Sequence, residues 1–274
     1  MKKCLVFQSD FGIGGGGAMY AVCRKVDPEL QLYDISHQIP NFDVKKASIS
    51  LRDNMTLWPK GTVFISVVDP GVGTARKASI AKTSNGYYVS TPDNGSLTYV
   101  LKEFGIDEIR VIDENKNRYK GTEKTHIFHG RDLFSYCAAK LAAGVISFEE
   151  VGESYPVEDI ITFDSKDNVV KEGYVETSVD DVDPFGNVIT SLMGNEFVKS
   201  AINEGDELEV SVNDNEPFTT CFHYSFNDTN VGDSLVYPNF NNVIGLSVNR
   251  GSFAEKYGVK ENDTITIRKV NSHE

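Results

Sequence analysis

The seven residues 62–68, Thr-Val-Phe-Ile-Ser-Val-Val, most strongly limit how this chain of 274 residues can fold. The run is almost continuously apolar and β-branched, which is typical of a strand that is covered on both faces of a sheet. Asp69 follows directly, and the next four residues, Pro-Gly-Val-Gly, prevent regular structure. The pattern therefore predicts a carboxylate at the carboxyl end of a central strand, where open α/β sheets bind ligands.

An aspartate at this position has two interpretations. Turns that follow strands commonly use aspartate as a cap, so the loop alone favours a structural role as much as a functional one. Two neighbours favour function, because Arg76 lies on the same loop and a polar stretch at 128–132, Phe-His-Gly-Arg-Asp, could face it.

Strand-like and helix-like patterns alternate up to about residue 155. This alternation predicts an α/β domain in which helices cover both faces of a mixed or parallel sheet. Two closely spaced runs, 78–83 and 87–91, are typical of a β-hairpin. The polar stretch 113–124 is expected to be exposed. The other predicted strands are 5–8, 30–35, 62–68 and 109–112, and the predicted helices are 18–26, 44–58, a segment ending near 104, and 133–143.

From residue 174 onward, short strand-like runs dominate. They predict a small antiparallel β-barrel. A polar stretch at 164–171 is expected to be a linker, which places an α/β domain at 1–163 and a barrel domain at 172–274. The predicted barrel strands are 174–179, 188–192, 207–212, 218–222, 234–236, 243–248 and 264–269.

The charge balance and the cysteines limit the possible partners and location. The chain has 27 Lys plus Arg against 40 Asp plus Glu, a formal net charge of −13, which argues against a nucleic-acid partner and favours a small molecule. No signal peptide and no membrane-spanning run is recognisable, so we expect a cytoplasmic protein without a membrane partner. Cys137, in an apolar helical context, is expected in the core. The scattered spacing of all four cysteines predicts free thiols: Cys4, Cys23, Cys137 and Cys221.

In the N-terminal half, two residues could contact a ligand. Asp10 follows the first predicted strand, where a carboxylate can accept two hydrogen bonds from a ribose diol, although it can equally cap a helix. Phe42 lies in a loop and could stack on a base or a cation, although packing is the commoner role of a phenylalanine. The glycine run 14–17 lacks the lysine and hydroxyl of a phosphate-binding loop, so phosphate binding is not expected there.

Two histidines lie close together in the sequence. His129 immediately precedes a predicted helix, where the helix dipole disfavours an imidazolium, so we expect it to be neutral. His126 lies three residues earlier, and the pair could bind a metal. No Glu or Cys nearby completes a ligand set, so no metal site is predicted, and a metal-dependent hydrolase remains an alternative.

The C-terminal half contains residues suited to an adenine ring. Asn187 can pair bidentately with the edge of an adenine. Phe185 or Phe240 can flank an aromatic ring. Each of these stretches could equally be a β-turn.

Six motifs, taken in order, resemble those of the S-adenosylmethionine hydroxide adenosyltransferases, which share a superfamily with the adenosyl-fluoride and adenosyl-chloride synthases. The resemblance covers nearly the whole chain. It implies an α/β domain followed by a β-barrel, a homotrimer with substrate sites at subunit interfaces, and hydrolysis of S-adenosylmethionine to adenosine and L-methionine without a cofactor. The motifs are Ser9-Asp10-Phe11-Gly12, Val68-Asp69-Pro70-Gly71-Val72-Gly73 with Arg76, Pro92-Asp93-Asn94-Gly95, Phe128-His129-Gly130-Arg131-Asp132, Asp183-Pro184-Phe185-Gly186-Asn187 and Val248-Asn249-Arg250-Gly251.

The resemblance implies a catalytic triad of Asp69, Arg76 and His129 that handles the attacking water. Methionine leaves as a neutral thioether, so no general acid is required at that end of the substrate. Asp69 can accept a proton from the water while Arg76 and His129 orient both. Charge pairing with Arg76 would keep Asp69 ionised.

The resemblance also implies substrate contacts. Asp10 would hold the ribose hydroxyls and Phe42 would stack near the sulfonium. Asp183 would contact the methionine amino group, and Asn187 would contact the adenine. Two residues would contact the adenine through the backbone around them, Val248 and Arg250. The remaining implied contacts are Asn94, Phe128, Gly130, Phe185 and Phe240.

Two alternatives remain open, a chlorinase-like halogenase and a non-catalytic binder of adenosine or S-adenosylmethionine. The halogenases carry a tyrosine where Asp69 stands, and a carboxylate beside the nucleophile would repel a halide. The fluorinating members carry a serine where Gly130 stands, and the short connection between 83 and 87 lacks their insertion. The glycine run 14–17 departs from the family, because it is short and lacks the acidic residue of that loop.

Overall fold

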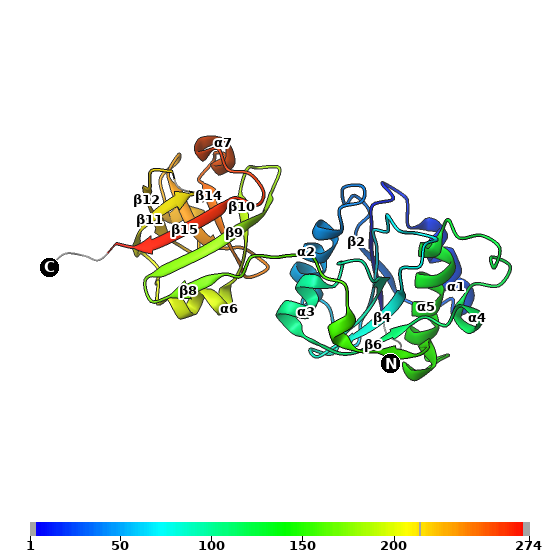
Figure 1. The fold of residues 1–274 in the computed structure, drawn as a ribbon. Coiled ribbons are helices and arrows are strands. Elements are labelled where there is room, and N and C mark those ends of the chain that lie inside the picture. Colours follow the sequence, from blue (N-terminus) through cyan, green and yellow to red (C-terminus); the bar gives the residue numbers. More distant parts are fainter. Residues whose placement is uncertain (1–3, 214, 271–274) are drawn as a thin grey trace. The chain divides into compact units, whose positions relative to one another are not determined.

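The computed structural model describes residues 4–213 and 215–270. The chain divides into two compact units, Met1–Phe163 and Asp164–Glu274 (Figure 1). The first contains a mixed sheet with helices and the second a closed β-barrel, which confirms the predicted fold class. Within the described residues, every helix is too short or too polar to cross a membrane.

The sheet of the first unit places β3 in its interior, between β1 and β5. Its strands are β1 (Leu5–Ser9), β2 (Leu32–Ser36), β3 (Val63–Val67), β4 (Ala78–Thr83), β5 (Tyr88–Pro92), β6 (Ile106–Val111) and β7 (Ser154–Tyr155). The spatial order is β2-β1-β3-β5-β4-β6-β7. β2, β1, β3 and β5 run parallel, whereas β4 is antiparallel to both β5 and β6. The predicted hairpin is therefore formed by β4 and β5.

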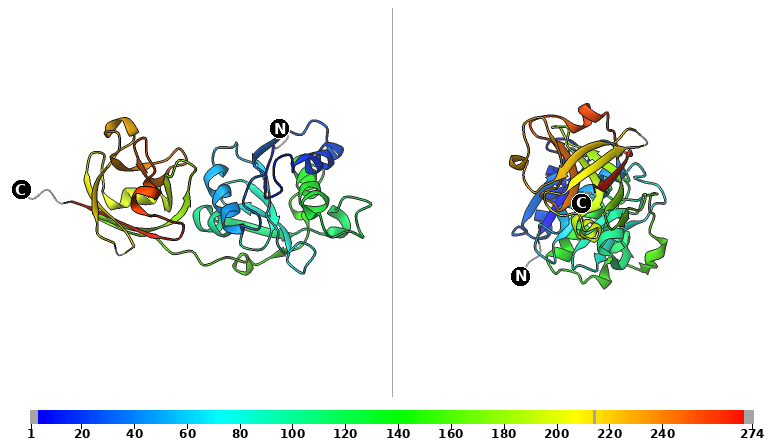
Figure 2. Two further views of the ribbon diagram at one scale, coloured as in Figure 1. Left: turned by 90° about the horizontal axis from the view of Figure 1, so that it is seen from above. Right: turned by 90° about the vertical axis from the view of Figure 1, so that its left-hand side faces the viewer.

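Helices cover both faces of this sheet. They are α1 (Gly17–Val26), α2 (Val44–Met55), α3 (Thr98–Phe104), α4 (Glu114–Asn117) and α5 (Tyr136–Ala142). Because side chains alternate along a strand, Leu5 and Phe7 of β1 enter the core shared with α1 and α5, whereas Val6 enters the core shared with α2 and α3. Figures 1 and 2 show α1 beside α5 on one face and α2 beside α3 on the other. The two cores hold β3 rigidly between them.

The barrel of the second unit closes through the pairing of β9 with β10. Its strands are β8 (Val169–Lys171), β9 (Tyr174–Val182), β10 (Val188–Met193), β11 (Glu207–Val212), β12 (Phe218–Phe222), β13 (Ser234–Pro238), β14 (Val243–Val248) and β15 (Thr264–Lys269). The order is β10-β14-β13-β12-β11-β15-β9-β8, and the β9–β10 pairing makes a closed ring of seven strands. Two short helices, α6 (Gly194–Phe197) and α7 (Phe253–Tyr257), lie between its strands in the sequence.

Two expectations about the second unit need correction. The stretch 164–171, expected as a linker, belongs to this unit, and its last three residues form β8 against β9 because Val169 and Val170 are good strand formers. The barrel is also not wholly antiparallel, since β12 and β13 pair in parallel. The connecting segment 223–233 is long enough to return the chain to the same end before β13 begins.

Two expectations about the first unit also fail. The stretch 113–124 is not simply exposed, because Asn117 and Arg118 are buried. The expected helix at 133–143 begins earlier, with a π-helical segment, η1 (Gly130–Ser135), that leads into α5. Ser135 Oγ donates to the Gly130 carbonyl at 2.6 Å within this segment. Such π-helical turns often occur at functional sites.

Candidate active site

Asp69 and Arg76 form a closed ion pair at the carboxyl end of β3. Arg76 Nε lies 3.0 Å from Asp69 Oδ1, and Arg76 Nη2 lies 2.5 Å from Asp69 Oδ2. The Asp69 side chain is 5% exposed and the Arg76 side chain is 9% exposed. The Arg76 guanidinium also packs over the Phe134 ring, 5.1 Å from its centroid. A carboxylate held this way by a planar fork has one fixed orientation.

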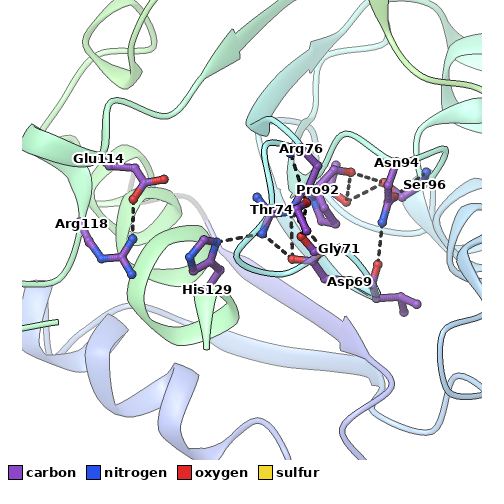
Figure 3. A network of polar contacts seen from close by, with 12 residues as sticks. Asp69, Gly71, Thr74, Arg76, Pro92, Asn94, Ser96, Glu114, Arg118 and His129 are labelled. Carbon is purple, nitrogen blue, oxygen red and sulfur yellow. Dashed lines mark hydrogen bonds and ion pairs between the residues drawn. The ribbon is translucent and has the colours of Figure 1, made fainter. Parts of the chain in front are cut away.

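His129, the residue that precedes η1, contacts this pair. Its Nδ1 lies 2.9 Å from Arg76 Nη2 (Figure 3). Arginine can only donate, so Nδ1 must be an unprotonated acceptor and the ring hydrogen is on Nε2. Burial lowers the pKa of His129, and the nearby cations Arg76 and Arg118 lower it further. The expected neutral state is therefore supported, but burial and two guanidinium groups cause it rather than the helix dipole alone.

The loop between Asp69 and Arg76 requires glycine at one point. Gly73 has a φ of +77°, and a Cβ there would lie 2.9 Å from the His126 carbonyl oxygen. Any side chain at this position would be strained and would push the loop away from the segment that carries His129. The loop is tied internally by Thr74 Oγ1, which donates to the Gly71 carbonyl at 2.7 Å.

A cavity of about 300 Å³ opens beside Asp69 and His129 in the first unit. Five of the predicted functional residues of the N-terminal half line it besides Asp69: Asp10, Phe42, Phe128, His129 and Gly130. No role was predicted for the other residues that line the cavity, which are Phe11, Asn41, Val67, Val72 and Ile127. Their only sequence signal was their position next to or within the flagged motifs.

The Asp10 carboxylate and the Phe42 backbone define one wall of this cavity. Phe42 N–H donates to Asp10 Oδ2 at 2.9 Å. Phe42 has a φ of +67°, an unfavourable conformation for a bulky residue, and its side chain is exposed. Backbone strain of this kind is concentrated at binding and catalytic sites. The other carboxylate oxygen of Asp10, Oδ1, can accept a hydrogen bond from a ligand.

Gly130 and two phenylalanines also line the cavity. Phe11 and Phe128 pack edge to face, with ring centroids 5.5 Å apart. A Cβ on Gly130 would lie 3.1 Å from the Phe11 ring and 3.3 Å from the Phe128 ring. Glycine therefore lets both rings approach the backbone at the start of η1.

A hydrogen-bonded chain behind this wall was not anticipated from the sequence. His37 Nδ1 lies 2.7 Å from Ser9 Oγ, which also accepts from Phe11 N–H at 3.3 Å. His37 Nε2 lies 2.8 Å from Tyr20 Oη. Ser9 and Phe11 flank Asp10, so this chain holds the backbone on both sides of the cavity carboxylate.

Asn94 occupies a supporting position. Its Nδ2 donates to the Val68 carbonyl at 3.0 Å, and its Oδ1 accepts from Ser96 N–H at 3.3 Å. Asn94 is not among the residues that line the cavity. The structure therefore places it as a brace for the end of β3, and a direct substrate contact remains a prediction.

The barrel unit has its own cavity, of about 460 Å³. The predicted residues that line it are Phe185, Asn187, Val248 and Arg250. Asn187 is fixed by two polar partners, since its Nδ2 donates to Asp183 Oδ2 at 2.8 Å and its Oδ1 accepts from Ser247 Oγ. Phe185 remains highly exposed, 79%. Arg250 has a φ of +58° at the rim.

Two predicted residues of the barrel lie outside the lining of this cavity. Asp183 is engaged in its own turn, where Oδ1 accepts from the N–H groups of Phe185 and Asn187, both at 2.9 Å. Phe240 projects into solvent and is 86% exposed. Their assigned substrate contacts remain predictions.

No third metal-ligating side chain accompanies His126 and His129 in the described part of the chain. Their rings lie 5.7 Å apart in an edge-to-face arrangement. Across residues 4–213 and 215–270, the one group of three side chains close enough to share a cation is Glu204, His223 and Asp228, in the barrel unit. The alternative of a metal at the two histidines has no geometric support.

Known proteins resemble this chain along almost its whole length. Residues 5–152 match the SAM hydroxide adenosyltransferase N-terminal domain, and residues 177–266 match the C-terminal domain. The (R)-S-adenosyl-L-methionine hydrolase of Thermus thermophilus is 31% identical over 270 residues, 95% of this chain and 98% of the relative. The fluorinase of Nocardia brasiliensis is 28% identical over 301 residues, 97% of each chain. A crystal structure of an uncharacterized conserved protein from Thermotoga maritima covers 97% of this chain and 100% of its own, with a TM-score of 0.89 and 35% identity.

Proposed function

Because the chain belongs to the SAM hydroxide adenosyltransferase family, we propose that it hydrolyses S-adenosyl-L-methionine to adenosine and L-methionine. The observation that carries this proposal is the hydrogen-bonded set of Asp69, Arg76 and His129 beside a cavity. A carboxylate held by an arginine that a histidine fixes in turn, at the end of an interior strand, is suited to position and activate water.

In the proposed reaction, a water oxygen attacks C5′ of the ribose in line with the C5′–S bond. The C5′–O bond forms as the C5′–S bond breaks, and the electron pair leaves with the neutral thioether of methionine. One proton of the water passes to the Asp69 carboxylate, either before the C5′–O bond forms or while it forms. Arg76 keeps that carboxylate in one orientation, and neutral His129 keeps Arg76 in place by accepting a hydrogen bond. No step requires a metal or a second cofactor.

The main competing function is transfer of a halide to the same carbon. The similarity of this chain to a fluorinase is the reason to consider it. The Asp69 carboxylate argues against it, because a halide placed beside this anion would be repelled. Gly130 lets the Phe11 and Phe128 rings approach the backbone, and by itself it excludes neither activity. We therefore place hydrolysis first and a chlorinase-like activity second.

The assembly and location that we propose follow the family resemblance. We propose a homotrimer in which substrate sites form at subunit interfaces. The two cavities offer complementary chemistry, since one carries Asp10 and Asp69 and the other carries Asn187 with an exposed ring. We also propose a cytoplasmic location, which the free thiols of all four cysteines support.

The test is a chromatographic product assay. Purified protein is incubated with S-adenosyl-L-methionine supplied separately in each sulfonium configuration, because the hydrolase relatives are named for the (R) form. Adenosine and L-methionine in equal amounts, unchanged by chelator, chloride or fluoride, are expected. A halogenated adenosine would indicate the competing function. Binding without turnover of either form would indicate a non-catalytic binder.

A further inference from the structure

The segment between β6 and η1 is anchored more firmly than its polar sequence suggests. Asn117 is buried and its Nδ2 donates to the carbonyls of Glu150 and Val151, both at 2.9 Å. Tyr119 N–H donates to the Asp132 carbonyl at 2.8 Å, which ties the segment to η1. These bonds fix the segment that leads directly to His129.

Arg118 is the polar centre of this segment and is only 7% exposed. Its Nε donates to the Thr122 carbonyl at 3.3 Å, and its Nη2 donates to the Thr125 carbonyl at 2.5 Å. Its Nη1 is paired with Glu114 Oε2 (Figure 3). One guanidinium therefore closes the loop 118–125 around itself and keeps its charge inside the protein.

The same guanidinium acts on His129 electrostatically. The charges that act on the imidazole are two cations, Arg76 and Arg118, and two carboxylates, Asp69 and Glu114. The His126 ring lies alongside on the same loop, with its centroid 5.7 Å away. Burial and the two cations lower the pKa of His129, and the two carboxylates oppose this change. Arg118 thus works in the same direction as Arg76 from a different part of the chain.

We propose that Arg118, anchored by Glu114, is a positioning residue of the active site, which fixes the loop 118–125 that leads to His129 and so keeps the imidazole within hydrogen-bond distance of Arg76. The proposal rests on the proposed hydrolysis, because it concerns the same triad. Its chemical logic is direct. A protonated His129 has no lone pair at Nδ1 and would repel Arg76, so the hydrogen bond that holds Arg76 in place would be lost. Removing the positive charge of Arg118 should therefore cause the hydrogen bond between Arg76 and His129 to be lost at a higher pH.

The first experiment measures the protonation of His129 without any turnover. The protein is labelled with ¹³C-histidine, and the ring signals are followed during a pH titration, with His129→Gln used to assign the signal. We expect Arg118→Met to raise the pKa of His129, because a cation is removed. Glu114→Gln should lower it, because a carboxylate is removed. Lys116→Met, which removes an exposed cation of the same segment, should leave it unchanged.

The second experiment separates charge from position. Arg118→Lys keeps the cation but cannot form the same fork to the two threonine carbonyls. We expect it to leave the pKa of His129 close to that of the unmodified protein but to lower kcat/KM by about 10- to 100-fold, since small displacements of catalytic groups have effects of this size. In Arg118→Met the acid limb of the pH–kcat/KM profile should also move to higher pH.

The outcomes separate this proposal from the proposed function. If the unmodified protein hydrolyses neither form of S-adenosyl-L-methionine, the function fails while the NMR titration still tests the effect of Arg118 on His129. Should Arg118→Met and Glu114→Gln both leave the His129 titration unchanged, or shift it in the same direction, the positioning role is overturned. Circular dichroism and the spectra of the other histidines identify a variant that has unfolded, and Glu114→Gln then carries the test.

Discussion

Replacement of Asp69 by asparagine tests the proposed chemistry with the smallest change in shape. The carboxylate accepts three hydrogen bonds from Arg76. An asparagine retains one oxygen acceptor but turns an NH2 group toward the guanidinium, and it cannot take a proton from water. The change therefore removes the proposed base while the cavity walls around Asp10 and Phe42 remain.

The expected effects on catalysis and on stability differ in size. Loss of a general base lowers kcat by roughly 10²- to 10⁴-fold, which corresponds to about 2.7 to 5.4 kcal/mol of activation free energy. Loss of the charge-assisted bonds to Arg76 should lower the free energy of unfolding by about 1.5 to 3 kcal/mol. Adenosine binding should change little, because its proposed ribose partner is Asp10 rather than Asp69.

The assay combines product chromatography, calorimetric titration with adenosine and thermal unfolding. Asp93→Asn is the matched control, because Asp93 is also buried and accepts hydrogen bonds from Tyr155 Oη at 3.0 Å and Ile161 N–H at 2.9 Å, away from the cavity. It should lose comparable stability and retain most of its kcat. If Asp69→Asn keeps a kcat within about threefold of the control, the proposed role of the carboxylate is refuted.

Three further predictions concern pH, the cavity wall and the thiols. Since the pKa of His129 lies below its ordinary value, kcat/KM should be constant between pH 7 and 8 and should fall only as the pH drops below about 6.5; a decline that begins above pH 7 would contradict the neutral triad. Gly130→Ala should displace the Phe11 ring and raise the Kd for adenosine by about tenfold, or ~1.4 kcal/mol, as measured by calorimetry. An unchanged Kd would mean that the ring moves without affecting binding. Burial raises the pKa of the Cys137 thiol to about 12, so iodoacetamide at pH 8 should modify Cys137 only after unfolding in urea, as peptide mass spectrometry can measure.

Local patterns in the sequence predicted much of the fold. Four barrel strands, β11, β12, β14 and β15, have the predicted bounds, because alternating side chains and flanking turn residues mark strands locally. Parallel pairing of β12 with β13 and closure of β9 on β10 depend on where distant segments meet. No local pattern encodes that meeting.

The stretch 113–124 shows the opposite case. Its polar residues indicated exposure, yet Asn117 and Arg118 are buried because backbone carbonyls and Glu114 satisfy their donors. The partners of Asn117, Glu150 and Val151, are distant in the sequence, so these hydrogen bonds cannot be inferred from composition. The polar composition therefore did not predict the burial of the segment that we propose to position His129.

The sequence by itself determined that a carboxylate, Asp69, closely follows β3 and begins a loop that carries Arg76. A continuous apolar run broken by proline and glycines permits little else. Only the tertiary structure decided that His129, 53 residues beyond Arg76, closes the hydrogen-bonded set, and that Asn94 braces the strand end instead of lining the cavity. The reason is physical: a strand and its turn are set by neighbours along the chain, whereas a triad exists only where packing of α5 and η1 against the sheet brings separate segments together.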